Sequence, residues 1–144
     1  MCNSNEFYEI ARSFCKWIEN TPKVEKSHYK DLLCFLSELY NSALYLQDVE
    51  SIDDIEIDVE RITIRFGETD GYWEIFNPYE CEAPVCGSLS DDFSDIYKEL
   101  KIGVILYEKG HINDAAWNWK WSFENHWSYH AVDAMRALNT LLCD

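Results

Sequence analysis

A run of aromatic residues, WNWKWSFENHWSYH, between Trp117 and His130 sets the tightest limit on the fold. Its fourteen residues contain four of the six tryptophans and two of the four histidines in the chain. If the run is helical, its aromatic side chains cover most of the helix circumference, which a helix that faces only solvent does not do. The run therefore predicts the centre of the fold, the wall of a functional site, or both.

Helical spacing divides these aromatic side chains between two roles. Trp117, Trp121 and Trp127, together with Phe123, are predicted to lie in the core, because large aromatic side chains dominate the energetics of protein cores. Trp119 falls on a different face from Trp117. We therefore expect Trp119 to be exposed beside a groove, where an indole can anchor a binding partner.

Apolar residues recur at helical spacing through most of the rest of the chain. This periodicity predicts helices over residues 5–20, 27–46 and 88–110, and a helix of about thirty residues over 113–143. Short connections favour antiparallel neighbours. A length of 144 residues suits one domain. We therefore predict an all-α fold, a single-domain bundle of about five helices over residues 1–144.

Two stretches between the second and fourth of these helices are harder to assign. The sequence from Arg61 to Phe66, RITIRF, alternates like a strand, but a lone strand has no obvious partner. A helix is therefore favoured there, and a strand is left open. Residues 71–87, GYWEIFNPYECEAPVCG, are expected to form an irregular aromatic loop that packs onto the domain, because Pro78 and Pro84 interrupt helices.

The charge balance narrows the classes of partner. Asp and Glu number 27 against 12 Lys and Arg, which gives a net charge of −15. Such a surface repels nucleic-acid phosphates and anionic membranes. It admits a basic protein partner or a cation. Since no apolar run approaches the roughly 20 residues of a membrane span, and no secretory signal is recognisable, we expect a cytoplasmic protein.

Two histidines suggest a metal site. His126 and His130 are four residues apart and Asp133 follows, so all three project from one face of a helix, as in helical metal sites. If the two last helices pack together, a further ligand could come from the acidic start of the helix at 88–110, which carries Asp91, Asp92 and Asp95. The alternative interpretation is that both histidines are hydrogen-bonded packing or surface residues, since the H-E-x-x-H motif is absent.

No motif of an enzyme is found. The chain lacks the G-x-S-x-G elbow of serine hydrolases and the glycine-rich loops that bind phosphates. The most consistent hypothesis is a non-enzymatic, acidic protein-interaction domain without a cofactor. Its candidate binding residues are Tyr72, Trp73, Glu74, Tyr79, Asp91, Asp92, Asp95 and Trp119. The alternative is a helical protein that binds a divalent metal or a small molecule around His126, His130 and Asp133.

The sequence from Tyr72 to Leu142 resembles a bacterial family of unknown function, DUF5063. The matching pieces are YWEIFNPYE, APV, LSDDFSDIYKELKIGVILYEKG, AAWNWKWSF, HW and MRAL, in this order. Asn77 stands where that family usually has Asp before the proline. His126, His130 and Asp133 are outside the pattern that characterises the family. The resemblance implies a helical domain and implies no activity.

Overall fold

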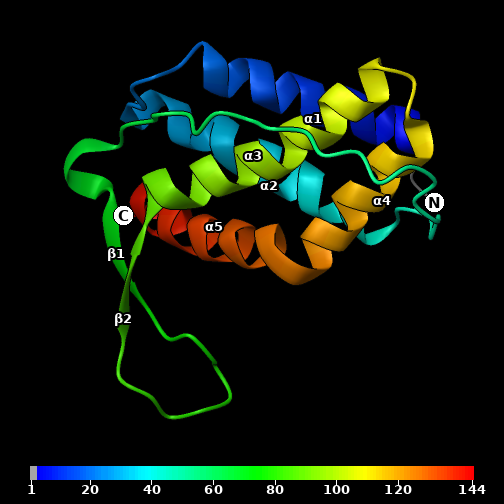
Figure 1. The fold of residues 1–144 in the computed structure, drawn as a ribbon. Helices are drawn as coiled ribbons and strands as arrows, with labels where there is room; N and C mark the ends of the chain where they lie inside the picture. The colour runs from blue at the N-terminus through cyan, green and yellow to red at the C-terminus, as the bar shows by residue number, and fades with distance from the viewer. Residues whose placement is uncertain (1–2) are drawn as a thin grey trace.

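Four helical segments form the body of the protein in the computed structural model, which describes residues 3–144 (Figure 1). The first three are α1 (Ser4–Glu19), α2 (Tyr29–Leu44) and α3 (Leu89–Glu108). The fourth consists of α4 (Ile112–Ser122), a π-helical turn (Phe123–Trp127) and α5 (Ser128–Cys143), which follow one another without a break. The long final helix is therefore confirmed in extent, but the described chain has four helical segments and not five.

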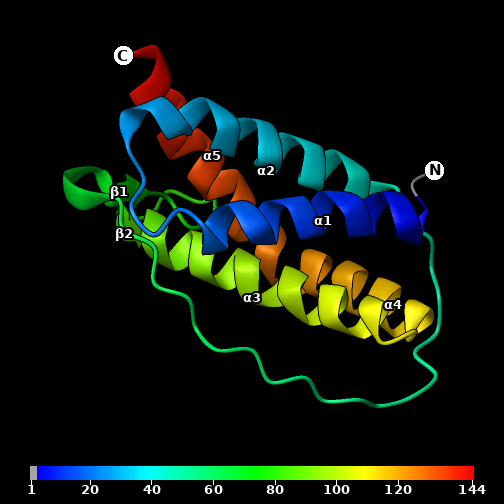
Figure 2. The same ribbon diagram turned by 90° about the horizontal axis from the view of Figure 1, so that it is seen from above.

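The helix α3 lies at the centre of the bundle and packs against α1, α4 and α5, whereas α2 packs against α1 and α5 (Figure 2). Ser88 caps the start of α3, and its side-chain oxygen accepts a hydrogen bond from the Asp91 backbone N–H. This cap satisfies one of the amides that a helix start leaves without a partner. The apolar side chains of α3 include Phe93, Ile96 and Leu100, each 0% exposed.

The prediction for the tryptophans was partly wrong. Trp119 is 0% exposed and donates a hydrogen bond from Nε1 to the Leu100 carbonyl, so it is a core residue and not an exposed anchor. Trp117 and Trp121 are instead exposed, and their rings stack on each other on the surface of α4. Trp127 is buried as predicted. The contact between α3 and α4 decides which indole is buried, and a single helix pattern does not reveal that contact.

The expected helix around residues 61–66 is also wrong, because residues 47–66 form an extended segment, here called the strap. The strap crosses the outer side of α3 (Figures 1 and 2). In its second half Ile62, Ile64 and Phe66 point inward while their neighbours are exposed, the two-residue period of extended chain. A parallel bridge joins Arg65 of the strap to Lys23. The alternation of apolar and polar residues and the β-branched side chains therefore favour an extended conformation here, even without a neighbouring strand.

The predicted irregular loop contains a two-stranded antiparallel hairpin, so the fold is mostly helical but not purely α. Strand β1 (Gly71–Glu74) pairs with β2 (Val85–Ser88), and β2 leads directly into α3. The hairpin projects from the helical body (Figure 1). The connection between the strands, residues 75–84, is exposed along most of its length instead of packing onto the domain.

Within residues 3–144 no helix combines the length and apolar composition needed to cross a lipid bilayer.

Candidate metal centre

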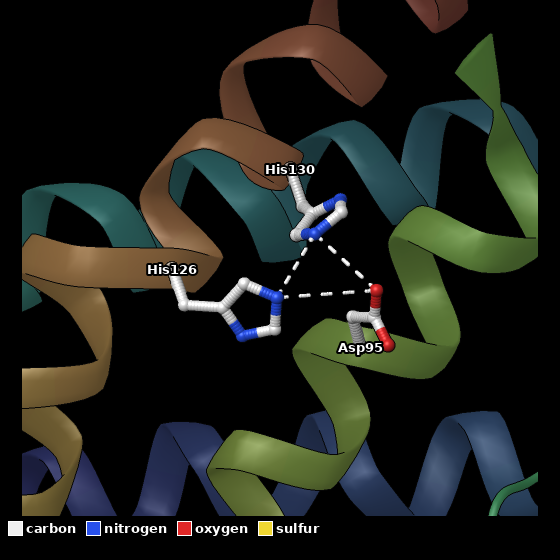
Figure 3. A group of neighbouring side chains, drawn as sticks. All are labelled: Asp95, His126 and His130. Carbon is white, nitrogen blue, oxygen red and sulfur yellow. Dashed lines mark hydrogen bonds and ion pairs between the residues drawn. The ribbon is translucent and has the colours of Figure 1, made fainter.

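Three potential metal ligands converge between α3 and the last helical segment: Asp95, His126 and His130 (Figure 3). His130 Nε2 lies 3.2 Å from His126 Nε2 and 3.3 Å from Asp95 Oδ2. His126 Nε2 lies 4.0 Å from the same carboxylate oxygen. The two predicted histidines are thus brought together, and the acidic ligand beside them comes from α3.

The π turn places the histidines at the point where α4 continues into α5. His126 lies in this turn and His130 lies in the first turn of α5. Side chains accommodate the turn by binding backbone carbonyls: Ser122 Oγ donates to the Asn118 carbonyl, and Asn125 Nδ2 donates to the Trp121 carbonyl. Such side-chain bonds compete with regular helical bonds. Single π turns within α-helices occur frequently at functional sites.

The orientation of His130 is set by a buried carboxylate. Its Nδ1 atom lies 2.7 Å from Asp92 Oδ1, and Asp92 is only 5% exposed. The other oxygen of Asp92 accepts a hydrogen bond from the Tyr72 hydroxyl. The bond with Asp92 raises the pKa of His130 from its ordinary value, although burial works in the opposite direction. Burial raises the pKa of Asp92, against the effect of its bonds with His130 and Tyr72.

The other two ligands have similar outer partners. His126 Nδ1 lies 3.2 Å from Glu99 Oε1. Arg61, on the strap, places Nη1 3.7 Å from Asp95 Oδ1, and its Nη2 binds Asp91 Oδ1 at 2.6 Å. Carboxylates that hold the outer nitrogen of a ligating histidine are the usual second layer of a metal site. Sequence reasoning missed Glu99 and Arg61, although Glu99 lies one turn after Asp95 on α3.

The hydrogen-bond partners of the two histidines favour a cation between Asp95 Oδ2, His126 Nε2 and His130 Nε2. An ionised carboxylate only accepts hydrogen bonds, so a tautomer that donates from Nδ1 suits the contacts of His130 with Asp92 and of His126 with Glu99. In the neutral imidazoles both Nε2 atoms then present lone pairs, and they face each other and a carboxylate oxygen of Asp95. Three electron-pair donors around one point are held together by a shared proton or by a metal ion.

The separations fit zinc. Ligand atoms about 2.0–2.1 Å from a tetrahedral zinc ion lie roughly 3.3–3.4 Å apart. Two of the three separations observed here, 3.2 and 3.3 Å, are close to that spacing. The His126 and Asp95 side chains remain 42% and 29% exposed, so solvent reaches the centre. Three protein ligands and a solvent-facing fourth position are typical of catalytic and not of structural zinc sites.

Asp133, the predicted third ligand, lies outside this triad. It contacts Glu74 of β1. Burial first, and then the contact with Asp133, raise the pKa of Glu74 to about 7. One Glu74 oxygen, Oε2, is buried without a hydrogen-bond partner. Both residues line a cavity of about 410 Å³ between β1 and α5, next to Tyr72 and Arg136. Of the predicted binding residues, Tyr72 and Glu74 therefore lie in the lining of this cavity.

The remaining predicted binding residues are dispersed. Trp73 and Tyr79 are 74% and 97% exposed on the hairpin, and Tyr79 is not part of the cavity lining. Asp91 is exposed at the start of α3 and pairs with Arg61. These side chains do not form one surface with the buried Trp119.

A second group that could hold an ion, Asp53, His111 and Asp114, has a structural explanation. Asp114 Oδ1 accepts hydrogen bonds from Ser51 Oγ and from the backbone N–H groups of Ile52 and Asp53. These bonds lower the pKa of Asp114, and the bond from Ser51 has the largest effect. The carboxylate thus fastens the strap to the first turn of α4, and no further ligand is required.

Comparison with known proteins gives a family and a fold. Residues 2–144 match the family described as a domain of unknown function, DUF5063. The crystal structure of protein BF1032 from Bacteroides fragilis superposes with a TM-score of 0.74 at 22% sequence identity, covering 96% of this chain and 94% of that one. At this level of identity the likeness extends to the fold alone. No curated protein matches the chain.

Proposed function

The chain belongs to the DUF5063 family, to which no function is attached, and we propose that it is a metal-binding protein that holds one divalent ion at Asp95, His126 and His130. The observation that carries this proposal is the convergence of Asp95 Oδ2 and the two Nε2 atoms within 4.0 Å of one another. Each of the three side chains also has a partner on its outer side, so the ligand atoms are held pointing inward.

Zinc is the ion that fits best. Imidazole nitrogen and carboxylate oxygen suit zinc and iron, whereas magnesium and calcium prefer oxygen ligands alone. Two of the three ligand separations, 3.2 and 3.3 Å, fit a tetrahedral ion. A dication also offsets the negative charge of the surrounding acidic side chains, which include Asp92 and Glu99 beside the histidines. With one position open to solvent, such an ion polarises a bound water molecule or a bound carbonyl group.

The proposal is tested by titrating untagged protein, treated with a chelator and kept reduced, with zinc in a calorimeter. We expect one zinc ion per chain, and weaker binding of magnesium. Asp95→Asn preserves size but removes the anionic ligand, and we expect it to lower the affinity at least tenfold. Stoichiometric zinc binding that is unaffected by both Asp95→Asn and His130→Ala would contradict the proposal.

A matched control uses the second histidine group. His111 lies beside Asp53 and Asp114, with its Nδ1 3.8 Å from Asp53 Oδ2. Because Asp114 already accepts hydrogen bonds from the strap, we expect His111→Ala to leave zinc binding unchanged. If His111→Ala removes the bound zinc and His130→Ala does not, zinc binds at Asp53, His111 and Asp114 and the proposed site is wrong.

We propose a second function, binding of a basic protein partner through the connection between β1 and β2. Its support is the exposure of Phe76 and Tyr79, 83% and 97%, beside the acidic residues Glu80 and Glu82. Exposed aromatic side chains with acidic neighbours suit a partner that offers both apolar and basic groups.

This second function is tested with a lysine-rich amphipathic peptide as the probe. We expect Phe76→Ser with Tyr79→Ser to weaken salt-sensitive binding of the peptide about tenfold, whereas Tyr45→Ser, at another exposed tyrosine, leaves it unchanged. Equal binding by both variants, or binding that ignores salt, would argue against the hairpin as the interaction surface.

We further propose a cytoplasmic location. The five cysteines of residues 3–144, Cys15, Cys34, Cys81, Cys86 and Cys143, are all free thiols, which suits a reducing compartment.

A further inference from the structure

The Tyr72 side chain links the β1–β2 hairpin to the proposed metal centre. The Tyr72 hydroxyl donates to one oxygen of Asp92, and the other oxygen of Asp92 lies 2.7 Å from His130 Nδ1. These contacts form an unbroken chain from β1 to a proposed ligand. Tyr72 is thus linked to the proposed ligand His130 through Asp92.

A glycine makes this arrangement possible. Tyr72 pairs with Gly87 across the hairpin, and the Tyr72 ring lies over the glycine. A Cβ atom at Gly87 would lie 2.6 Å from Tyr72 Cζ and 2.9 Å from its hydroxyl oxygen. Since real Cβ atoms do not come so close, any other residue at position 87 would displace the tyrosine from Asp92.

Other contacts also hold the hairpin to the helical body. Glu74 of β1 contacts Asp133 of α5 beside the cavity of about 410 Å³. Isolated two-stranded hairpins are marginally stable in water. The hydrogen bond to buried Asp92 therefore contributes to docking this hairpin, together with the Glu74–Asp133 contact and the bonds around Asp70 at its base.

From these contacts we propose that Tyr72 is a positioning residue for the metal ligand His130, and that metal binding and docking of the hairpin stabilise each other. The inference rests on the proposed metal site. Tyr72 holds Asp92 in the orientation that directs His130 Nε2 toward Asp95. In return, a metal ion fixes His130 and Asp92 and thereby fixes the acceptor that Tyr72 needs. Such coupling is reciprocal by thermodynamic necessity.

The test combines zinc affinity with hydrogen exchange of the backbone amides in β1 and β2, using the full chain. In the wild type we expect zinc to slow exchange in the hairpin. Tyr72→Phe keeps the ring but removes the donor, so we expect about tenfold weaker zinc binding and loss of the zinc-dependent protection. Gly87→Ala keeps the hydroxyl but displaces it, and we expect the same two effects.

Tyr45→Phe serves as the control, because Tyr45 is exposed and lies outside the hairpin. It should bind zinc and protect the hairpin like the wild type. If the wild type binds zinc at Asp95, His126 and His130 but hairpin exchange does not respond, the coupling is disproved while the metal site stands. If the wild type binds no zinc, the metal site itself fails. If Tyr72→Phe keeps the zinc affinity and the zinc-dependent protection of the hairpin, Tyr72 does not position His130.

Discussion

At the scale of single residues, Gly103 determines how α3 and α4 approach each other. A Cβ atom at this position would lie 2.0 Å from Trp119 Nε1, and Trp119 is completely buried. Alanine in place of glycine normally stabilises a helix by about 0.5–1 kcal/mol. Here we expect Gly103→Ala to lower the free energy of unfolding by about 1–3 kcal/mol, the usual cost of overpacking. Urea denaturation measures this change.

The control for this variant is Lys98→Ala, at an exposed position of the same helix. It should change stability by less than about 0.5 kcal/mol, as surface substitutions usually do. A more stable Gly103→Ala protein would mean that the indole of Trp119 does not pack against α3 in solution.

Glu74 provides a pH-dependent prediction. Burial first, and then Asp133, raise its pKa from 4.5 to about 7. The folded state therefore keeps a proton that the unfolded chain releases, so this group costs stability as pH rises from about 4.5 to about 7, and the loss is complete above that range. We expect Glu74→Gln to raise the Tm at pH 8, because a neutral amide can donate to Asp133 at every pH.

The measurement is the Tm of both proteins in the presence of a chelator at pH 5 and pH 8. The advantage of Glu74→Gln should be larger at pH 8. An advantage of equal size at both pH values would show that Glu74 does not change its protonation between them.

At the scale of elements, periodicity predicted the helices well because it depends on neighbours within one segment. His126 and His130 were correctly paired for the same reason, since a spacing of four survives in the π turn. Trp119 was misplaced because its burial depends on Gly103, sixteen positions away in another helix. Likewise, the choice of Asp95 as the acid beside the histidines depends on how α3 packs on α5, which no local pattern contains.

The strap illustrates an element held by a few contacts. Asp114 Oδ1 accepts three hydrogen bonds from residues 51–53. We expect Asp114→Ala to release this part of the strap and to lower the free energy of unfolding by about 1.5–3 kcal/mol, the range for hydrogen bonds to a charged group. Limited proteolysis with a glutamate-specific enzyme should then cleave faster after Glu50 and Glu56.

Asp48→Ala is the matched control for the strap, because the Asp48 side chain is 95% exposed and pairs with Lys120 at the surface. Its cleavage rate should stay close to that of the wild type. Should both variants be cleaved equally fast, the Asp114 bonds do not hold the strap in place.

At the scale of the whole molecule, the proposed metal centre joins parts that are distant in the sequence. Asp95 comes from α3, the histidines come from the last helical segment, Arg61 reaches in from the strap, and Tyr72 reaches in from the hairpin. The strap therefore contributes a side chain that contacts a proposed ligand, and the hairpin contributes one that contacts Asp92 behind His130. This arrangement gives the strap and the hairpin a role that helix packing alone does not require.

A metal that bridges α3 and α5 binds the folded chain far better than the unfolded one, so zinc should raise the Tm. At a concentration one hundred times its Kd, the stabilisation is about 2.7 kcal/mol. For a chain of 144 residues this corresponds to a Tm shift on the order of 5–10 °C. At pH 5 the shift should largely disappear, because a proton competes with zinc for His130, whose pKa is raised by its hydrogen bond with Asp92. Asp95→Asn retains every cysteine, so a shift that persists in this variant would assign the effect to zinc bound by thiols and not to the proposed centre.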